Sequence, residues 1–363
     1  MASRRIFLQQ AGLVAASVAY SPLTLAGWQK KDRLGIALVG LGYYSTDLLA
    51  PALQQTKKCY LAGIVTGTPS KAEQWMKKYN LPEKNVYNYQ NFDQIANNKD
   101  IDVVYVVLPP SMHREYVIRA ANAGKHVWCE KPMAITEREC QDMIDACRKN
   151  KQKLAIGYRL QHEPNTKQYV KLLRDGKIGK IKTVNCAAGY VENRTNHWKQ
   201  KKELGGGVMY DMGVYSLQGA RLATGEEPIS LTAEQSTSRP EIYKNGLDET
   251  SVARLVFPSG AVANIRTSFG QNVNYLKVVG EKGTLNMEPY SAYAGVKGEA
   301  TGGIVIDHPY QVPWQQANQM DDDADHILNN RAMPVPGEEG LKDIRIVEAI
   351  YRAAKSGQSV KLT

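Results

Sequence analysis

The sequence predicts an α/β protein in which an N-terminal Rossmann-type, doubly wound parallel sheet is followed by a C-terminal α+β domain built on a mainly antiparallel open sheet. Short apolar runs alternate with helical segments in the first half, and longer alternating strands begin near Lys180. The chain has 363 residues, more than one hydrophobic core usually serves. We therefore expect two domains, at residues 33–157 and 158–363.

The first half has the pattern of repeated βα units. Buried parallel strands are short runs rich in Val, Ile and Leu, and this half contains LGIALVG (34–40), YLAGIVTG (60–67), IDVVYVVLPP (101–110), KHVWCEK (125–131) and KLAIGYR (153–159). Helical segments follow at residues 70–80, at 112–124 and from 137 onward, the last after an expected N-cap at Thr136. Units of this kind form a doubly wound sheet.

The second half is expected to form longer strands. Apolar and polar side chains alternate at residues 180–192, 249–260 and 261–270, and the turn PSG at 258–260 predicts a hairpin. Such alternation is typical of an antiparallel sheet with one open face. A final helix is expected at residues 341–357, ending at Gly357.

The N-terminus has the composition of a twin-arginine export signal. Arg4 and Arg5 precede an uncharged, moderately apolar run at residues 11–26. The alternative, an amphipathic first helix, would need polar side chains on one face, and this run carries no charge. We expect residues 1–26 to be removed and the protein to be periplasmic. No other segment approaches the roughly 18 apolar residues of a membrane span.

Composition argues against several other classes of protein. The net charge is +10, but Lys and Arg are dispersed, and we interpret the densest cluster, KQKK at residues 199–202, as surface charge. A nucleic-acid-binding protein would show a basic stripe. The five cysteines are odd in number and form no CxxC, so neither a disulfide framework nor a metal site is indicated, and we expect buried thiols.

A glycine-rich turn follows the first predicted strand. VGLGYYS (39–45) places Gly40 and Gly42 in dinucleotide-binding spacing, with Ser45 where a third small residue is usual. The backbone N–H groups at a helix start can receive a pyrophosphate. The second strand is followed by Thr66, Ser70 and Lys71 rather than by an acidic residue that would bind a ribose 2′-hydroxyl. This pattern favours NADP over NAD, although Lys71 alone is equally typical of a solvated lysine.

Three later stretches carry a family resemblance. HVWCEKPMA (126–134), IGYRLQHEP (156–164) and residues 203–228, which include DMGVY, resemble the family of glucose-fructose oxidoreductase, inositol dehydrogenase and their relatives, and are most similar to the glucose-fructose oxidoreductase branch. The resemblance covers essentially the whole chain and implies a catalytic role for Lys131, which follows Glu130. Many relatives have a histidine four residues after the aspartate, whereas this branch has a tyrosine, as in Asp211 and Tyr215.

These residue types suit hydride chemistry on a sugar. Oxidation at C1 leaves a hydroxyl proton that needs a base, and a phenol is a poor base near neutral pH unless a neighbouring cation stabilises its phenolate. Lys131 can supply that cation, and the i, i+4 spacing of Asp211 and Tyr215 places both on one helix face. The structural alternative makes Tyr215 a core residue and Asp211 a helix cap. The family order of these residues favours the catalytic interpretation.

The resemblance implies further site residues. The predicted cofactor-binding set is Gly40, Gly42, Tyr43, Tyr44, Thr66, Ser70, Lys71, Tyr89, Leu108, His113, Glu130, Lys131, Arg159 and Trp198. The predicted substrate-binding set is Lys131, Arg159, His162, Asp211 and Tyr215.

Together these features predict a periplasmic sugar oxidoreductase with tightly bound NADP. It would oxidise an aldose to its lactone and reduce a second sugar or carbonyl compound by ping-pong hydride transfer, because folded export can carry a bound cofactor to a compartment with little free NADP. The alternatives are a nicotinamide-dependent glycoside hydrolase, an aldose or polyol dehydrogenase with exchangeable NAD(P), and a sugar-binding protein without catalysis. Only residues 27–33 separate the signal from the first strand, so we expect a homodimer through the open sheet or a homotetramer without a long N-terminal arm.

Overall fold

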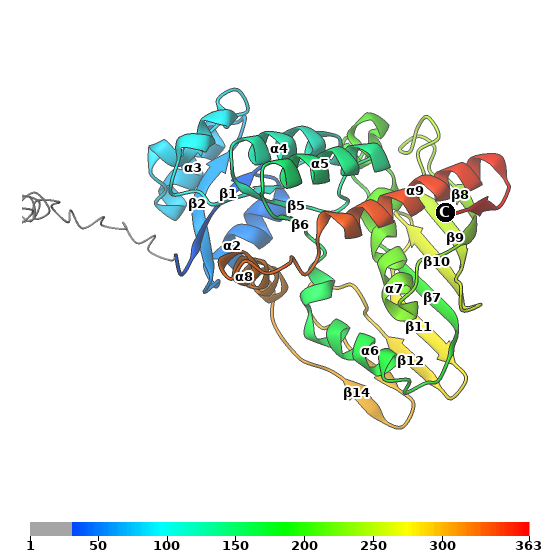
Figure 1. Cartoon of the computed structure of the whole chain (residues 1–363). Coiled ribbons are helices and arrows are strands. Elements are labelled where there is room, and N and C mark those ends of the chain that lie inside the picture. Colours follow the sequence, from blue (N-terminus) through cyan, green and yellow to red (C-terminus); the bar gives the residue numbers. More distant parts are fainter. Residues whose placement is uncertain (1–30, 363) are drawn as a thin grey trace, which may run out of the picture. The chain divides into compact units, whose positions relative to one another are not determined.

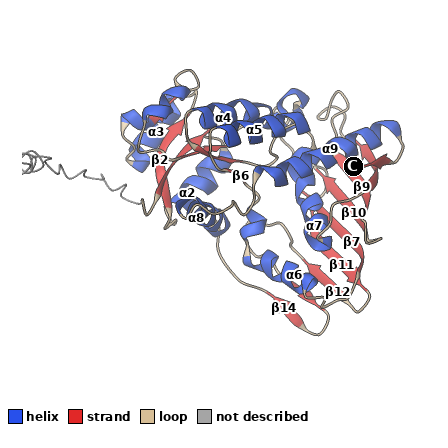
Figure 2. Cartoon of the chain, viewed as in Figure 1, coloured by secondary structure: helices blue, strands red, loops and turns tan. Residues whose placement is uncertain are grey.

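The computed structural model describes residues 31–362, so the predicted signal at residues 1–26 lies outside the described residues. Within residues 31–362 the strands form two sheets, one of six strands and one of nine (Figure 2). All five cysteines fall within the described range and are buried and free, as predicted.

The first sheet is entirely parallel and has the strand order of a dinucleotide-binding fold. In spatial order its strands are β3 (Val86–Tyr87), β2 (Cys59–Val65), β1 (Leu34–Val39), β4 (Val103–Val106), β5 (His126–Cys129) and β6 (Leu154–Ile156). The order reverses between β1 and β4, and open α/β sheets bind ligands at the carboxyl ends of the strands at such a point. The predicted Rossmann-type sheet is therefore confirmed, with β3 as an additional edge strand.

Helices cover both faces of this sheet, which explains why its strands are continuously apolar. The α-helices of residues 31–362 are α2 (Ala50–Leu53), α3 (Pro69–Tyr79), α4 (Pro110–Asn122), α5 (Glu137–Lys149), α6 (Pro164–Arg174), α7 (Val214–Thr224), α8 (Trp314–Leu328) and α9 (Gly337–Ser356). On β1, Ala37 and Val39 pack with residues of α4 and α5. Ile36 and Leu38 face the other way, toward α2, α3 and α8. A helix from late in the sequence, α8, thus covers the first sheet beside α2 (Figure 1).

Local signals set several helix ends. Thr136 caps α5 as predicted, since its side chain accepts a hydrogen bond from the backbone N–H of Glu139 in a capping box. The last helix ends before Gly357, which has φ +67°. It begins earlier than predicted, at Gly337.

The second sheet is mainly antiparallel, as predicted, with one parallel pair, β7 and β10. In spatial order its strands are β14 (Ile304–Ile306), β13 (Gly298–Ala300), β12 (Thr284–Met287), β11 (Val273–Gly280), β7 (Ile181–Gly189), β10 (Val262–Ser268), β9 (Thr250–Val256), β8 (Ser230–Ser236) and β15 (Val360–Lys361). Helix α7 packs on β7 and β10, while α9 contacts α5 and β6 as well as β8. Helix α9 therefore ties the two sheets together (Figure 1).

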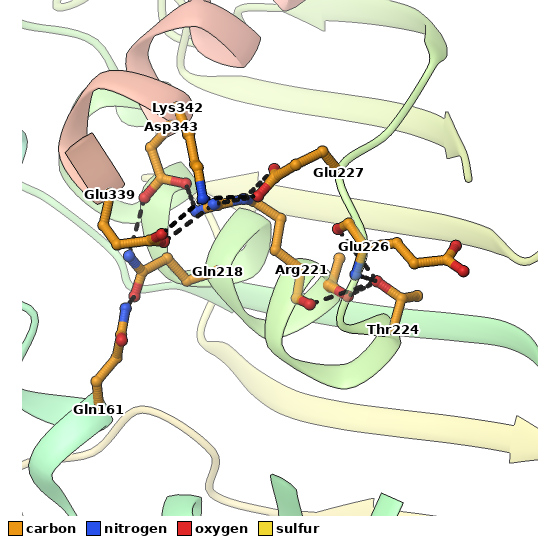
Figure 3. Close-up of polar contacts among 10 residues, drawn as sticks. Gln161, Gln218, Arg221, Thr224, Glu226, Glu227, Glu339, Lys342 and Asp343 are labelled. Atoms are coloured by element: carbon orange, nitrogen blue, oxygen red, sulfur yellow. Dashed lines mark hydrogen bonds and ion pairs between the residues drawn. The ribbon is translucent and has the colours of Figure 1, made fainter. Parts of the chain in front are cut away.

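A buried ion-pair network fixes α9 against α7 (Figure 3). The Arg221 guanidinium contacts Asp343 at 2.6 Å and Glu339 at 3.0 Å, and it also binds Glu227. Gln218 donates to Asp343 at 3.0 Å. Because Arg221 lies on the helix that begins with Val214, this network holds that helix in place. Within residues 31–362 we find no helix with the length and apolarity of a membrane span.

Candidate active site

The glycine turn lies at the carboxyl end of β1 and leads into a short π-helix, η1 (Tyr44–Leu49). Gly40 has φ +90°, and a Cβ there would lie 2.4 Å from the main-chain oxygen of Val107, so glycine is required. A Cβ at Gly42 would meet no protein atom within 4 Å. Ser45 is buried, and its hydroxyl donates to the Gly40 carbonyl at 2.6 Å. Protein atoms therefore fill the space beside Gly40, whereas the space beside Gly42 is free. A pyrophosphate could approach the start of the helix there.

The loop after β2 and the first turn of α3 carry the residues predicted to hold a 2′-phosphate, which are Thr66, Ser70 and Lys71. The Lys71 ammonium donates to the Leu41 carbonyl at 3.0 Å, so it reaches the glycine turn. The Tyr89 ring packs on the same loop, 3.0 Å from where a Cβ of Gly67 would lie. The cation, the loop and the glycine turn therefore share one end of the sheet, as NADP binding requires.

His113 joins two loops of the site. Its Nε2 atom lies 2.8 Å from the Leu108 carbonyl and its Nδ1 atom lies 3.0 Å from the Pro132 carbonyl. Its side chain is buried, and burial lowers its pKa. The ring nitrogen that carries the proton donates to one of these carbonyls, and through these contacts His113 helps to position the loop that carries Lys131. Leu108 faces the glycine turn, because its Cδ2 atom would lie 2.7 Å from a Cβ at Gly40.

The three predicted catalytic residues come together. The Lys131 ammonium donates to the main-chain oxygen of Asp211 at 2.7 Å and to its Oδ1 at 3.3 Å, and lies 4.6 Å from the centroid of the Tyr215 ring. Asp211 lies within the π-helix η7 (Met209–Gly213), which runs directly into α7, so it is not the cap that the structural alternative proposed. Burial alone would lower the pKa of Lys131, but Tyr215 and Asp211 raise it above its usual value.

Asp211 has a second cationic partner that the sequence analysis missed. The Lys199 ammonium binds Asp211 Oδ2 at 2.6 Å and the Tyr190 hydroxyl at 2.6 Å. Burial alone would raise the pKa of Asp211, but Lys199 and then Lys131 hold it far below its usual value. The interpretation of KQKK as surface charge was therefore wrong for Lys199, whose side chain is only 15% exposed. Its position directly after Trp198 was the one available signal.

Arg159 joins the two halves of the chain. It is buried in the turn η4 (Arg159–His162), and it donates to the main-chain oxygens of Ser291 at 2.6 Å and Ala292 at 3.1 Å. Its guanidinium carbon lies 5.2 Å from the centroid of the Tyr215 ring and 4.5 Å from that of Tyr293. Arg159 therefore lies beside the catalytic group. Tyr293 was missed because no local motif marks it.

Glu130 contacts the backbone of Lys131 and helps to fix its position. Its Oε1 atom accepts a 2.5 Å hydrogen bond from the Tyr105 hydroxyl, and its Oε2 atom accepts from the Lys131 backbone N–H at 3.2 Å. A Cβ at Gly157 would lie 2.6 Å from Oε1, so the chain leaves space for this carboxyl group. Burial raises the pKa of Glu130 to about 7. Burial and then Glu130 raise the pKa of Tyr44, whose ring centroid lies 6.2 Å from that of Tyr293.

Three predicted residues are placed differently from the rest. The His162 side chain is fully buried, and its Nδ1 atom lies 2.8 Å from Asp322 of α8. Its side-chain hydrogen bond is thus to α8, and its role toward a substrate stays a prediction. Trp198 lies beside Lys199, with its ring centroid 5.7 Å from that ammonium, and thus borders the Asp211 side of the site. Tyr43 is 63% exposed next to the open glycine position.

Comparisons with known proteins agree with this arrangement. A family model described as "Oxidoreductase family, NAD-binding Rossmann fold" matches residues 34–158, and one described as "Oxidoreductase family, C-terminal alpha/beta domain" matches residues 170–362. The chain is 25% identical over 352 residues to "D-xylose 1-dehydrogenase [NADP(+)]" of Haloarcula marismortui, covering 92% of this chain and 96% of that protein.

Solved structures give the same result. The aldose-aldose oxidoreductase from Caulobacter crescentus, complexed with glycerol, is 41% identical with a TM-score of 0.87, covering 91% of this chain and 100% of that one. A levoglucosan dehydrogenase in complex with NADH and L-sorbose has a TM-score of 0.77 at 19% identity, covering 92% and 100%, which shows the shared fold. Since both family models match and together span most of the chain, it belongs to the oxidoreductase family of glucose-fructose oxidoreductase and inositol dehydrogenase.

Proposed function

We propose that this protein is a sugar oxidoreductase that oxidises an aldose at C1 to the lactone and reduces a second sugar or carbonyl compound, using NADP that stays bound between the two steps. The observation that carries the proposal is the contact of Lys131 with both Asp211 and Tyr215, at the end of the sheet that bears the glycine turn. The names of two relatives, an aldose-aldose oxidoreductase and an NADP-dependent D-xylose dehydrogenase, support the substrate class and the cofactor.

The described residues fit a dinucleotide. Gly40, Gly42 and the start of η1 would hold its pyrophosphate, and Lys71 with Thr66 would hold a 2′-phosphate. When bound, the nicotinamide supplies the acceptor and donor of hydride.

Side chains of the protein accept and return the proton of the sugar hydroxyl. The Lys131 ammonium stabilises Tyr215 as a phenolate, and this phenolate Oη takes the proton of the C1 hydroxyl and becomes the phenol. Asp211 orients Lys131 and offers a carboxylate to a sugar hydroxyl. In the second half-reaction Tyr215 returns the proton to the new hydroxyl of the reduced compound, so no net proton is released.

The proposed location is the periplasm. Arg4, Arg5 and the uncharged run at residues 11–26 support export by the twin-arginine route. Export of a folded protein with its cofactor would explain why a periplasmic enzyme retains NADP. We also propose a homodimer through the uncovered face of the nine-stranded sheet, or a homotetramer without an N-terminal arm.

Near-ultraviolet absorption of the purified protein tests this function. We expect a nicotinamide spectrum that survives dialysis, a reduced band that grows when an aldose is added, and loss of that band when a ketose follows. Protein that is purified empty and turns over only with added NAD(P) would instead indicate a dehydrogenase with exchangeable cofactor. A bound cofactor that no sugar reduces would contradict the proposal.

A further inference from the structure

Lys199 reaches the site from the loop between β7 and η7. Its ammonium lies 2.6 Å from Asp211 Oδ2 and 2.6 Å from the Tyr190 hydroxyl. Lys202, in the same KQKK run, is exposed, whereas the side chain of Lys199 is only 15% exposed. Lys199 thus makes a specific contact in a partly enclosed position.

Aromatic rings enclose the Lys199 ammonium. It lies 5.1 Å from the ring centroid of Tyr190, 5.7 Å from that of Trp198 and 5.8 Å from that of Phe269. The face of an aromatic ring attracts a cation, and more strongly where water is excluded. Three rings and two oxygen acceptors thus hold this charge at one side of Asp211.

Two ammonium groups share the Asp211 carboxylate. Lys131 lies 3.3 Å from Oδ1 and Lys199 lies 2.6 Å from Oδ2, and the exposed fraction of the Asp211 side chain is only 9%. The Asp211 carboxylate attracts both ammonium groups, and each ammonium repels the other. The net stabilisation of the charged form of Lys131 is therefore smaller than Asp211 alone would provide.

We propose that Lys199 is a positioning residue of this site, an inference that rests on the proposed function. Lys199 holds the Asp211 carboxylate in place beside Lys131, and its charge limits the net stabilisation of the Lys131 ammonium. Loss of the Lys199 charge would then make Lys131 harder to deprotonate. The Asp211 carboxylate, no longer compensated by Lys199, would also disfavour the nearby Tyr215 phenolate, so proton transfer to Tyr215 would need a higher pH.

Other charged and titratable groups surround this pair. They are Glu130 after β5, Arg159 in η4, Tyr215 in α7, and Tyr190, Glu192, Arg194 and His197 in the loop after β7. None of them changes in the variants below, so a shift at Lys131 reports the removed charge.

Competitive labelling of lysines, read for the Lys131 peptide by mass spectrometry, measures when Lys131 loses its proton and does not require turnover. Relative to the parent holoprotein, we expect Lys199→Met to raise the apparent pKa of Lys131 by about one unit. Single-turnover reduction by an aldose should show the same upward shift in its pH dependence. Lys199→Arg keeps the charge and should restore parental behaviour in both readouts, and the exposed control Lys202→Met should change neither.

An unchanged Lys131 titration in Lys199→Met would overturn the inference, as would equal effects of Lys199→Met and Lys199→Arg. If Lys199→Met fails to retain its fold by circular dichroism, Lys199→Gln removes the charge with a polar side chain of smaller volume and takes its place. Failure of the proposed function is recognised separately. If no sugar reduces the cofactor of the parent protein, the titration of Lys131 can still be measured.

Discussion

The Nζ atom of Lys131, in the loop after β5, lies 4.6 Å from the centroid of the Tyr215 ring at the start of α7. Tyr215→Phe keeps this ring and removes only the group that takes the proton. Loss of a general base costs about 100- to 10,000-fold in rate, so we expect both half-reactions to slow by that order in single-turnover absorption measurements. Bound cofactor and fold should persist.

Tyr210→Phe is the matched control. Tyr210 lies in η7 but its hydroxyl donates to the main-chain oxygen of Ile135 at 2.7 Å, away from Lys131. Its hydride transfer rates should stay within a few-fold of the parent. Tyr215→Phe turning over at a similar rate would remove Tyr215 from its role and direct attention to Lys131 itself.

Lys71 should discriminate between the two nicotinamide cofactors. Lys71→Glu replaces a donor to a 2′-phosphate by a like charge and an acceptor for a ribose hydroxyl. The dissociation constant of the refolded apoprotein for NADP should rise much more than that for NAD, measured by calorimetry. Lys77→Glu, on the same helix and exposed, should affect neither cofactor strongly. Equal losses for both cofactors in Lys71→Glu would show that Lys71 does not read the phosphate.

The network in Figure 3 should determine stability. The side chain of Arg221 is 6% exposed and that of Asp343 is fully buried. Removing one partner of a buried ion pair costs about 3–5 kcal/mol, so Arg221→Ala should lower the free energy of unfolding by that order in urea titrations. Arg148→Ala removes an exposed arginine that also contacts a residue of α9, and should cost less than about 1 kcal/mol. Similar costs for the two variants would mean that the network contributes little.

Two buried carboxyl groups should make stability fall with rising pH. Burial raises the pKa of Glu130 to about 7 and that of Asp323 in α8 to about 7. The folded protein therefore holds protons that the unfolded chain has already released. Their favourable contribution is complete below the unfolded pKa values and is lost as the pH rises through about 7.

The free energy of unfolding should accordingly decrease as the pH rises from about 4 to about 7, and level off above that. His113, His126 and His197, whose pKa values burial lowers, titrate in the same window and act in the opposite direction, so the contribution of the carboxyl groups is read from their variants. Glu130→Gln and Asp323→Asn should each make the decrease shallower in urea titrations at three pH values. Glu115→Gln, on the surface of α4, should leave it unchanged. A decrease of the same slope in all three variants would assign it to other groups.

The sequence predicted the first sheet well because its signal is local. Strands covered on both faces are apolar throughout, and Thr136 and Gly357 mark helix ends through their own backbone and side-chain geometry. The edge strand Val86–Tyr87 was missed because two residues carry no periodicity. The family resemblance placed Lys131, Asp211 and Tyr215 in one site, and no spacing rule could have done so.

Other features depend on contacts between distant segments. Helix α8 buries Gln316, Gln319 and Asp323, so its polar composition gives no sign that one of its faces covers the first sheet. The same packing brings His162 into contact with Asp322. Lys199 belongs to a basic run that also contains the exposed Lys202, and its side chain is largely buried because its loop folds back onto Asp211. Periodicity and helix caps depend on residues that are close in the sequence, so the sequence alone determines them. Whether a charge can be buried depends on a partner from a distant segment that compensates its desolvation, and only the tertiary structure decides this.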